Sequence, residues 1–406
     1  MREEIIEKKT VSKCFNITAG AIDSMRINTN VETTVRVYEN EKIGIAGRVG
    51  ACNIDELREE AKKNLALGIP YPDLPNPPVE RSVDCYKEIV PDGELVATMK
   101  KLMARVCAEN PEFTFGNKII IEETQQKYVS EKTNYSYRGN SLVFSITIKF
   151  KGSANIMDEG YSVEVTEYDE DEIAKGIKKT CDSFLSKAQF PEGEKAVVAI
   201  DESLAGMMLA HFTADYYFNH LSLFDGKLGE QIFNEKFNVC CDRDPKRAKN
   251  LPFFDAEGVV SENDCAYLIK DGVMKGLFAT KKQAAQYGCE YIGVAGASYN
   301  GVPSISGAGF KLMPTADDIS DVVKGEVIYV SVSSGGDMTA DGTLSLPVIV
   351  SYLLKDGEVV GKLPGFAVTA SAKDLFGKDF LGVAKNGFYK HSNSVIVAKA
   401  NIVNKE

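Results

Sequence analysis

The chain has 406 residues, of which 44% are hydrophobic and 26% are charged, the composition of an ordinary globular protein. Its formal net charge is -11, and no Lys- or Arg-rich stretch stands out. These properties disfavour a nucleic-acid-binding protein, because contacts to phosphate need a concentrated basic surface. The length predicts two domains, each able to bury its own core.

Signal, membrane and disulfide patterns are missing from the sequence. The N-terminus is charged and has no apolar core of signal-peptide length. The longest apolar run, residues 346–354, is far shorter than the roughly 20 residues that a membrane span needs. The cysteines number nine and form no CxxC pair, so we expect free thiols in a reducing compartment. The interpretation is a soluble, cytoplasmic protein.

The first elements of the chain are predicted to be a hairpin, a helix and an extended connection. Residues 33–47 alternate apolar and polar side chains around a turn at Glu39-Asn40-Glu41, which indicates a β-hairpin. Asn53 is predicted to cap a helix over residues 54–67, and Gly68 to end it. The proline-rich residues 70–79 can be neither helix nor central strand. They therefore form either a domain boundary or an ordered strap across one domain.

The rest of the N-terminal half is predicted to alternate helices and strands. A second helix covers residues 92–110, and a β-rich stretch follows over residues 118–150, interrupted at Arg138-Gly139-Asn140. Within that stretch, residues 141–150 are the longest strand. A further strand is predicted at 161–167, and a helix at 169–188 begins with acidic residues that suit the helix dipole. Phe190-Pro-Glu-Gly193 then separates an N-terminal domain, residues 1–190, from a C-terminal domain, residues 194–406.

The C-terminal half is predicted to be mostly antiparallel β-structure with one or two helices. A strand at 196–200 is followed by a helix at 203–221, and the sequence beyond Asn250 becomes strand-like and rich in turns. Five glycine-containing segments are predicted to be hairpin turns, because glycine supplies the positive φ angles that such turns require: residues 255–258, 270–272, 334–337, 341–342 and 355–357. The fold class of the whole chain is therefore α+β.

The three histidines limit the acid-base and metal chemistry that the chain can offer. His211 and His220 point to opposite sides of the predicted helix, so they cannot share a metal on it. His211 and Asp215, four positions apart, share a face of that helix. They could ligate a metal, but a hydrogen bond between imidazole and carboxylate is the interpretation that we favour. His391 is predicted to lie on a surface turn.

Motifs for nucleophilic and dinucleotide chemistry are incomplete. Gly296-Ala-Ser-Tyr-Asn300 has asparagine where the nucleophile elbow needs its second glycine. Gly307-Ala-Gly309 lacks the third glycine of a dinucleotide fingerprint. Cys240 and Cys241 are predicted to be half-buried strand residues and not a reactive site.

Two acidic turns were considered as calcium sites. Asp255 with Glu257, and Asp337 with Asp341, lack the dense ligand spacing of a calcium loop. Turn formation is the better explanation of both pairs.

Several stretches together resemble the TldD/PmbA family, whose members were once called modulators of DNA gyrase. Their order and spacing carry the resemblance, which is clear over residues 196–383 and weaker upstream. The matching stretches are Leu228-Gly-Glu-Gln-Ile-Phe233, Phe254-Asp-Ala-Glu-Gly-Val259, Leu268-Ile-Lys-Asp-Gly-Val-Met-Lys-Gly276, Thr280-Lys-Lys282, Gly335-Gly336, Asp341-Gly-Thr-Leu-Ser345 and Lys355-Asp-Gly-Glu358.

The resemblance implies a fold and a function. It implies a PmbA/TldD-like α+β fold and a heterodimeric zinc protease that encloses an unfolded peptide and trims it. An added β-strand suits that task, because main-chain hydrogen bonds hold a peptide with little regard to its sequence. One subunit type of the family carries a His-Glu-x-x-x-His helix and a cysteine ligand near the C-terminus. The other, the PmbA or TldE type, keeps the fold without the metal site.

At the positions that match the metal motif, this chain has Ala210, His211 and Asp215. Ala210 stands at the first metal histidine, His211 at the catalytic glutamate and Asp215 at the second histidine. A frame shifted by one residue puts His211 at the first histidine and Phe212 and Tyr216 at the other two positions.

Neither frame keeps the general base or the three protein ligands that a hydrolytic zinc needs. The cysteine ligand is missing as well, since the last cysteine is Cys289. The resemblance therefore implies a non-catalytic subunit of the TldE type, with no cofactor of its own. Zinc is expected in a TldD-like catalytic partner, and the substrate is expected to be an unfolded peptide.

Two other hypotheses stay open at this point. The chain could be a homodimeric peptide-binding or regulatory protein without enzymatic activity, in which case its partner is a second copy of itself. It could also be an enzyme that uses His211 and Asp215 in an unfamiliar metal site. Neither a nucleic acid nor a membrane is expected as a partner.

Overall fold

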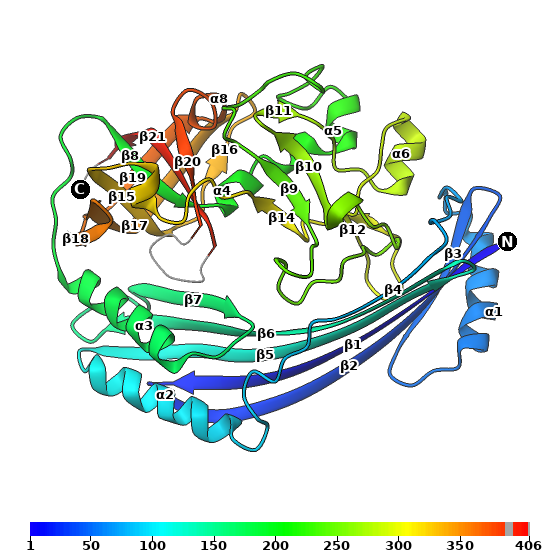
Figure 1. Ribbon diagram of the computed structural model, residues 1–406, viewed down its shortest axis with the longest axis horizontal. Coiled ribbons are helices and arrows are strands. Elements are labelled where there is room, and N and C mark those ends of the chain that lie inside the picture. The colour runs from blue at the N-terminus through cyan, green and yellow to red at the C-terminus, as the bar shows by residue number, and fades with distance from the viewer. Residues whose placement is uncertain (386–392, 405–406) are drawn as a thin grey trace.

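The computed structural model describes residues 1–385 and 393–404 and has the α+β architecture that the sequence predicts. A long curved sheet with helices forms the N-terminal half, and the β-rich C-terminal half lies over the concave side of that sheet (Figure 1). His391 falls outside the described residues. No helix among the described residues is long and apolar enough to cross a membrane.

The N-terminal half is built on long antiparallel strands that run side by side along its whole length (Figure 1). The sheet has the order β3-β2-β1-β5-β6-β4, and β7 also pairs with β6. The strands are β1 (Arg2–Thr18), β2 (Ala21–Glu39), β3 (Lys42–Val49), β4 (Val79–Asp84), β5 (Phe113–Ser130), β6 (Thr133–Phe150) and β7 (Glu159–Val165).

The long β5–β6 hairpin corrects one expectation from the sequence. Arg138-Gly139-Asn140 was expected to interrupt the β-rich stretch, but these residues stay in register within β6, opposite Gln125, Thr124 and Glu123 of β5. Arg138 also pairs with Asp84 of β4 on the other side. The continuous pairing with β5 keeps Gly139 within the strand, although a glycine alone would weaken it. The turn of the hairpin lies instead at residues 131–132.

The predicted hairpin, first helix and strap are confirmed. The β2–β3 hairpin turns at Asn40 and Glu41, whose φ angles are 52° and 57°. Helix α1 (Ile54–Asn64) begins at Asn53, whose side chain accepts a 2.9 Å hydrogen bond from the amide of Asp55, and a 3-10 turn (Leu65–Leu67) carries it to Gly68. Residues 70–78 then run between two strands of one sheet, so they are a strap and not a domain boundary.

Two amphipathic helices bury their apolar faces in the core of this half. They are α2 (Leu95–Glu109) and α3 (Glu170–Leu185), each slightly shorter than predicted. Met99, Leu102 and Ile177 are fully buried, and each such side chain contributes about 1.5–3 kcal/mol of transfer free energy. Asp169 caps α3 by accepting a 3.0 Å hydrogen bond from the amide of Glu172.

In the C-terminal half, five strands pair in a closed ring. The ring has the order β15-β8-β21-β19-β17, and β17 pairs again with β15. Strand β17 closes the ring with its two ends. Its residues 343–348 pair with β19, and its residues 348–355 pair with β15. The members are β8 (Lys195–Asp201), β15 (Glu326–Ser333), β17 (Thr343–Lys355), β19 (Phe366–Ser371) and β21 (Val395–Val403), with β16 (Asp337–Met338), β18 (Glu358–Lys362) and β20 (Phe380–Ala384) added at the margins.

Smaller elements make up the rest of this half. A four-stranded sheet has the order β11-β10-β9-β14, and β12 pairs with β13. The strands are β9 (Val239–Asp242), β10 (Cys265–Lys270), β11 (Val273–Met274), β12 (Ala295–Gly296), β13 (Ser304–Ile305) and β14 (Phe310–Leu312). The short helices are α4 (Ser203–Gly206), α5 (Ala214–Phe218), α6 (Lys281–Tyr287), α7 (Ile319–Val322), α8 (Ala372–Leu375) and the 3-10 turns η2 (Leu209–Phe212) and η3 (Glu262–Asp264).

Three of the five predicted hairpin turns are confirmed and two are wrong. Residues 270–272 join β10 to β11, 341–342 join β16 to β17, and 355–357 join β17 to β18. Residues 334–337 connect β15 to β16, but both strands pair with β17 and not with each other. Residues 255–258 lie between no paired strands. A buried carboxylate, Asp255, supplies the turn-forming hydrogen bonds there in place of a strand ladder.

The two halves share a hydrophobic core. Phe115 and Phe144 of the long sheet belong to the same buried cluster as Tyr329, Tyr352 and Val397 of the ring. An ion pair also crosses between the halves, where the guanidinium of Arg81 donates hydrogen bonds of 2.6 and 2.7 Å to the carboxylate of Asp264. The division at residues 190–194 stays a prediction, and these contacts hold both sides of it together.

Candidate functional site

The helix predicted over residues 203–221 is broken into short pieces. Helix α4, the turn η2 and helix α5 replace it. The break lies at Thr213, which is extended (φ -78°, ψ 145°) and caps α5 through its hydroxyl. The amide of Phe278 donates to the carbonyl of Phe212, and the amide of Ala214 donates to the carbonyl of Phe278. Hydrogen bonds to a distant residue therefore replace the hydrogen bonds of a continuous helix at this point.

This break separates His211 from Asp215, and each side chain has other partners. Nδ1 of His211 accepts a 3.2 Å hydrogen bond from the amide of Leu223. The two carboxylate oxygens of Asp215 accept from Gln283 Nε2 at 3.0 Å and from the hydroxyl of Tyr287 at 2.9 Å. The pKa of His211 is lowered, because burial disfavours the charged imidazolium. The favoured hydrogen bond between the two residues is therefore wrong, since it depended on one continuous helix.

The remaining histidine and acidic candidates also have local partners. His220 lies beyond the end of α5, with Nδ1 2.8 Å from Oδ2 of Asp225. Asp337 lies in β16 and accepts a hydrogen bond from the amide of Met338, whereas Asp341 lies in the turn before β17, as predicted, and accepts from the amide of Thr343. Within residues 1–385 and 393–404, no group of three or more His, Cys, Asp or Glu side chains is placed to hold a metal ion.

The adjacent cysteines are more deeply buried than expected. Cys240 and Cys241 lie on β9, 0% and 1% exposed, so the prediction of half-buried positions is wrong. They are covered because β9 is an inner strand, paired on both sides. Burial raises the pKa of Cys241 to about 11, even though Arg243 acts in the opposite direction.

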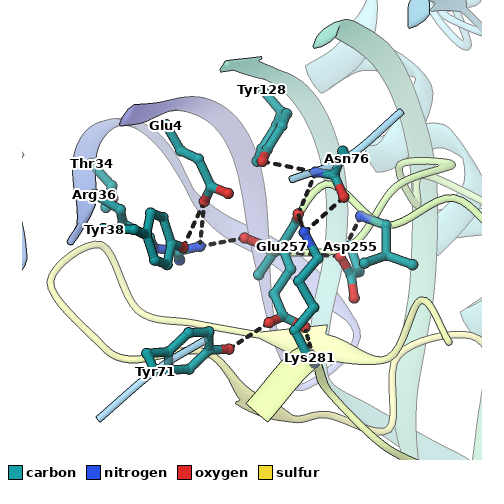
Figure 2. A network of polar contacts seen from close by, with 12 residues as sticks. Glu4, Thr34, Arg36, Tyr38, Tyr71, Asn76, Tyr128, Asp255, Glu257 and Lys281 are labelled. Atoms are coloured by element: carbon teal, nitrogen blue, oxygen red, sulfur yellow. Dashed lines mark hydrogen bonds and ion pairs between the residues drawn. The ribbon is translucent and has the colours of Figure 1, made fainter. Parts of the chain in front are cut away.

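The most extensive polar constellation joins the strap, the long sheet and the start of α6, and Figure 2 shows it at close range. Lys281 is at its centre and is 2% exposed. Its Nζ donates to Oδ1 of Asn76 at 2.7 Å, to the carbonyl of Leu74 at 2.9 Å and to the carbonyl of Glu257 at 3.3 Å. A buried ammonium group with three acceptors is well satisfied, so Lys281 fastens the strap to the C-terminal half.

Glu257 holds the strap at a second point. Its Oε1 accepts a 2.5 Å hydrogen bond from the hydroxyl of Tyr71, and its Oε2 accepts from the amide of Lys281 at 3.1 Å. Burial, and then the neighbouring carboxylate of Asp255, raise the pKa of Glu257 to about 7. Burial likewise lowers the pKa of Lys281, against the attraction of Glu4 and Glu257.

On the long sheet, Glu4 is enclosed by cations and a tyrosine. It is 1% exposed and accepts hydrogen bonds from Arg2 and, at 2.9 Å, from the hydroxyl of Tyr38. Burial alone would raise the pKa of Glu4, but Arg2, Lys281 and Arg36 together hold it below its usual value. Arg36 reaches across to the other half, where its Nη1 donates a 2.5 Å hydrogen bond to the carbonyl of Ala256.

Beside this network lies a polar cleft of about 280 Å³ between the long sheet and the C-terminal loops. Its floor carries side chains of β1, β2 and β5, among them Lys8, Thr34, Arg36 and Gln126. Its other wall consists of residues 250–256 and 295–299 with Arg243, Ser306 and Ala308. Two inaccessible polar atoms of the lining have no hydrogen-bond partner, Nε of Arg36 and Oδ1 of Asn250. The accessible side chains of Lys8 and Gln126 supply hydrogen-bond donors and an acceptor to the cleft, as a peptide backbone requires.

The sequence did not predict this network. Asp255 and Glu257 were assigned only to a turn, and turn bonding is confirmed for Asp255, which accepts from the amides of Glu257 at 2.8 Å and Val259 at 2.9 Å. The partners Tyr71 and Asn76 lie in the proline-rich strap, far away in the sequence. One signal was available: Asp255, Glu257 and Lys281 all lie within stretches that carry the family resemblance.

Comparisons with known proteins agree with that resemblance. Residues 194–402 match the family described as the PmbA/TldA metallopeptidase C-terminal domain. An uncharacterised protein of Methanocaldococcus jannaschii is 23% identical over 370 residues, which cover 88% of this chain and 86% of that protein. The metalloprotease TldD homolog of Haemophilus influenzae is 25% identical over 169 residues, 40% of this chain and 34% of the homolog.

The fold has a close counterpart among solved structures. The crystal structure of TldE from Thermococcus kodakarensis superimposes with a TM-score of 0.79 at 18% sequence identity, covering 99% of this chain and 96% of that one. At this level of identity the likeness concerns the fold, including the long N-terminal sheet that the matched domain leaves out. The match over residues 194–402 takes in more than half of the chain. The chain belongs to the PmbA/TldD family.

Proposed function

We propose that this chain is the non-catalytic, TldE-type subunit of a cytoplasmic zinc metalloprotease that processes or degrades unfolded peptides. In this proposal a TldD-like partner carries the zinc, and this chain helps to enclose the peptide. The observation that carries the proposal is the arrangement of Ala210, His211 and Asp215. By the family resemblance these residues stand at the positions of the metal motif, yet Ala210 and His211 lie on η2 while Asp215 lies on α5.

The residues present do not fit a zinc ion. Ala210 has no ligand atom, Nδ1 of His211 accepts a backbone hydrogen bond, and both oxygens of Asp215 are engaged by Gln283 and Tyr287. A hydrolytic zinc needs three protein ligands and a nearby base for its water. Peptide hydrolysis is therefore assigned to the partner, and no step of it to this chain.

We assign peptide contact to the cleft between the long sheet and residues 295–299. The support is its composition, because accessible polar side chains on the long strands can hydrogen-bond to an extended main chain. The cleft also lies next to the Lys281 network, which keeps its two walls at a fixed distance. The shape of the cleft thus depends on the strap as well as on the long sheet.

Reconstitution tests the proposal. The chain, a homologue with the His-Glu-x-x-x-His sequence from the same genome, and their mixture are compared for bound zinc and for cleavage of an unfolded peptide. We expect a complex of the two subunits, with zinc and activity that do not depend on His211, so that His211→Ala behaves like the wild type. Stoichiometric zinc together with peptidase activity in this chain alone would overturn the proposal.

The same experiment separates the alternative that the sequence left open. A chain that forms only a self-dimer, binds peptide and ignores the homologue would instead be a homodimeric peptide-binding or regulatory protein. Loss of zinc or activity on exchanging His211 would support a metal site in this chain. Each outcome is read from size-exclusion mass, metal content and turnover of the same samples.

A further inference from the structure

Three sulfur atoms gather on one face of the four-stranded sheet, away from the strap and the cleft. Cys240 lies on β9, the strand between β10 and β14. It lies directly opposite Tyr267 on the neighbouring strand β10 and Lys311 on the neighbouring strand β14. Cys265 and Met313 are each two positions from those residues, so their side chains are the diagonal neighbours of Cys240 on the same face. Sγ of Cys240 lies 3.5 Å from Sδ of Met313.

The diagonal placement favours a bridging atom over a direct disulfide. Diagonal neighbours in an antiparallel pair have Cα atoms roughly 7–8 Å apart. A disulfide needs about 4.4–6.8 Å. A metal ion bound between the sulfurs spans a longer gap than a direct sulfur–sulfur bond. With metal–sulfur bonds of about 2.3 Å in a trigonal plane, the sulfurs lie about 4.0 Å apart. The separation of 3.5 Å between Cys240 and Met313 is close to that spacing.

A cation lies close to the two thiols. Arg247 pairs with Asp242, the residue directly opposite Cys265 in the sheet. Its guanidinium acts to lower the pKa of Cys265 and so favours the thiolate form that metal binding requires.

The carboxylate next to the cluster is not free to serve as a hard ligand. Asp242 is 3% exposed, and its two oxygens accept hydrogen bonds from Nε and Nη2 of Arg247 at 2.8 and 2.9 Å. The cluster therefore offers two thiols and a thioether without an oxygen or nitrogen ligand. Cys240 is fully buried, whereas Cys265 and Met313 are half-buried and leave a path from solvent.

We propose that Cys240, Cys265 and Met313 form a binding site for a soft monovalent metal ion of the Cu(I) class. Thiolate and thioether ligands select Cu(I), whereas structural zinc sites almost always have four ligands. On binding, each thiol gives up its proton to solvent, so two thiolates and one Cu(I) carry a single negative charge near the guanidinium of Arg247. This site is independent of the proposed peptidase role, since it shares no residue with the cleft or with His211.

Anaerobic titration of the full chain with Cu(I), in competition with a chromophoric Cu(I) chelator, tests the proposal. We expect one tightly bound Cu(I) per chain, with release of protons as the thiols become thiolates. Cys265→Ser should weaken binding at least about 100-fold, and Met313→Leu about 10-fold. Cys14→Ser, which removes a half-buried thiol far away on β1, is the control and should bind like the wild type.

X-ray absorption of the copper-loaded wild type should show sulfur neighbours alone, and Met313→Leu should lose one of them. The leucine variant keeps the shape of the site, so it decides the question even if Cys265→Ser folds poorly. Equal copper binding in wild type, Cys265→Ser and Met313→Leu would overturn the proposal, because scattered thiols would then account for the copper. Zinc binding at the same site with equal or greater affinity would overturn the choice of a soft monovalent ion.

Discussion

Lys281 donates a 2.7 Å hydrogen bond to Asn76, which joins the start of α6 to the proline-rich strap across 205 positions of sequence. Both side chains are buried, and the same ammonium group also reaches the strap through the carbonyl of Leu74. The first prediction follows from this pair.

Lys281→Met should destabilise the fold by about 3–5 kcal/mol, because Glu257 would then be buried without its cation, whereas Glu4 would keep Arg2 and Arg36. The change also removes the donor to two acceptors on the strap. Urea unfolding measures the difference, with Lys282→Met as the matched control, since the neighbouring lysine is exposed. Equal losses in the two variants would show that the buried network contributes nothing specific.

Gly258→Ala should cost more than about 3 kcal/mol. The residue has a φ of 69°, and an added Cβ would lie 2.4 Å from Cζ of Tyr128 and 2.6 Å from Nδ2 of Asn76. Gly226→Ala is the control, with a φ of 70° and open space around its Cβ, so it should show only the backbone cost of about 1 kcal/mol. Unfolding midpoints in urea give the comparison. A cost for Gly258→Ala no larger than that of the control would argue against close packing at the strap.

Glu202 should make stability depend on pH in a defined window. Burial raises the pKa of its carboxyl to about 7 from the ordinary 4.5. Because the folded state holds the proton more tightly, this stabilisation is fully present below about pH 4.5 and is lost as the pH rises to about 7. We expect the wild type to lose on the order of 2–3 kcal/mol across that window relative to Glu202→Gln.

Urea unfolding of the wild type and the Glu202→Gln variant from about pH 5 to about pH 8 measures this difference. Glu235→Gln, at an exposed site, controls for the loss of one carboxylate and should follow the wild type. Parallel curves for wild type and Glu202→Gln would contradict the expected titration.

The proposed peptide contact predicts a kinetic effect in the reconstituted complex. Lys8 projects into the cleft, whereas Lys9, its neighbour on β1, points to the opposite face of the sheet. Lys8→Ala should raise KM for an unfolded peptide by about 3- to 10-fold and leave kcat unchanged, because it removes only ground-state binding. Lys9→Ala should change neither value. If both variants behave alike, the peptide lies elsewhere in the complex.

Local signals in the sequence predicted much of the fold. Asn53, Gly68 and Asp169 are found at the helix ends where they were expected, because capping depends on atoms within one or two turns. The turn around Asn40 was predicted for the same reason.

Features set by distant partners were not predicted. Gly139 lies inside a strand because β5 pairs with it, and Thr213 breaks a helix because Phe278 pairs with it. The prediction of the candidate site failed for the same reason. His211 and Asp215 share a face only on an unbroken helix, and Tyr71 and Asn76 are brought to Glu257 by the path of the strap.

Strand β21, residues Val395–Val403, lies inside the ring, with β8 on one side and β19 and β20 on the other. Val395 and Val397 of this strand also belong to the core shared with the N-terminal sheet. Residues 395–403 must therefore leave the ribosome before either half can close its core. Until then the nascent chain exposes the open edges of β8 and β19, and such long-range pairing is slow to form. The nascent chain thus stays open to aggregation and to cellular proteases until β21 has been made and has paired.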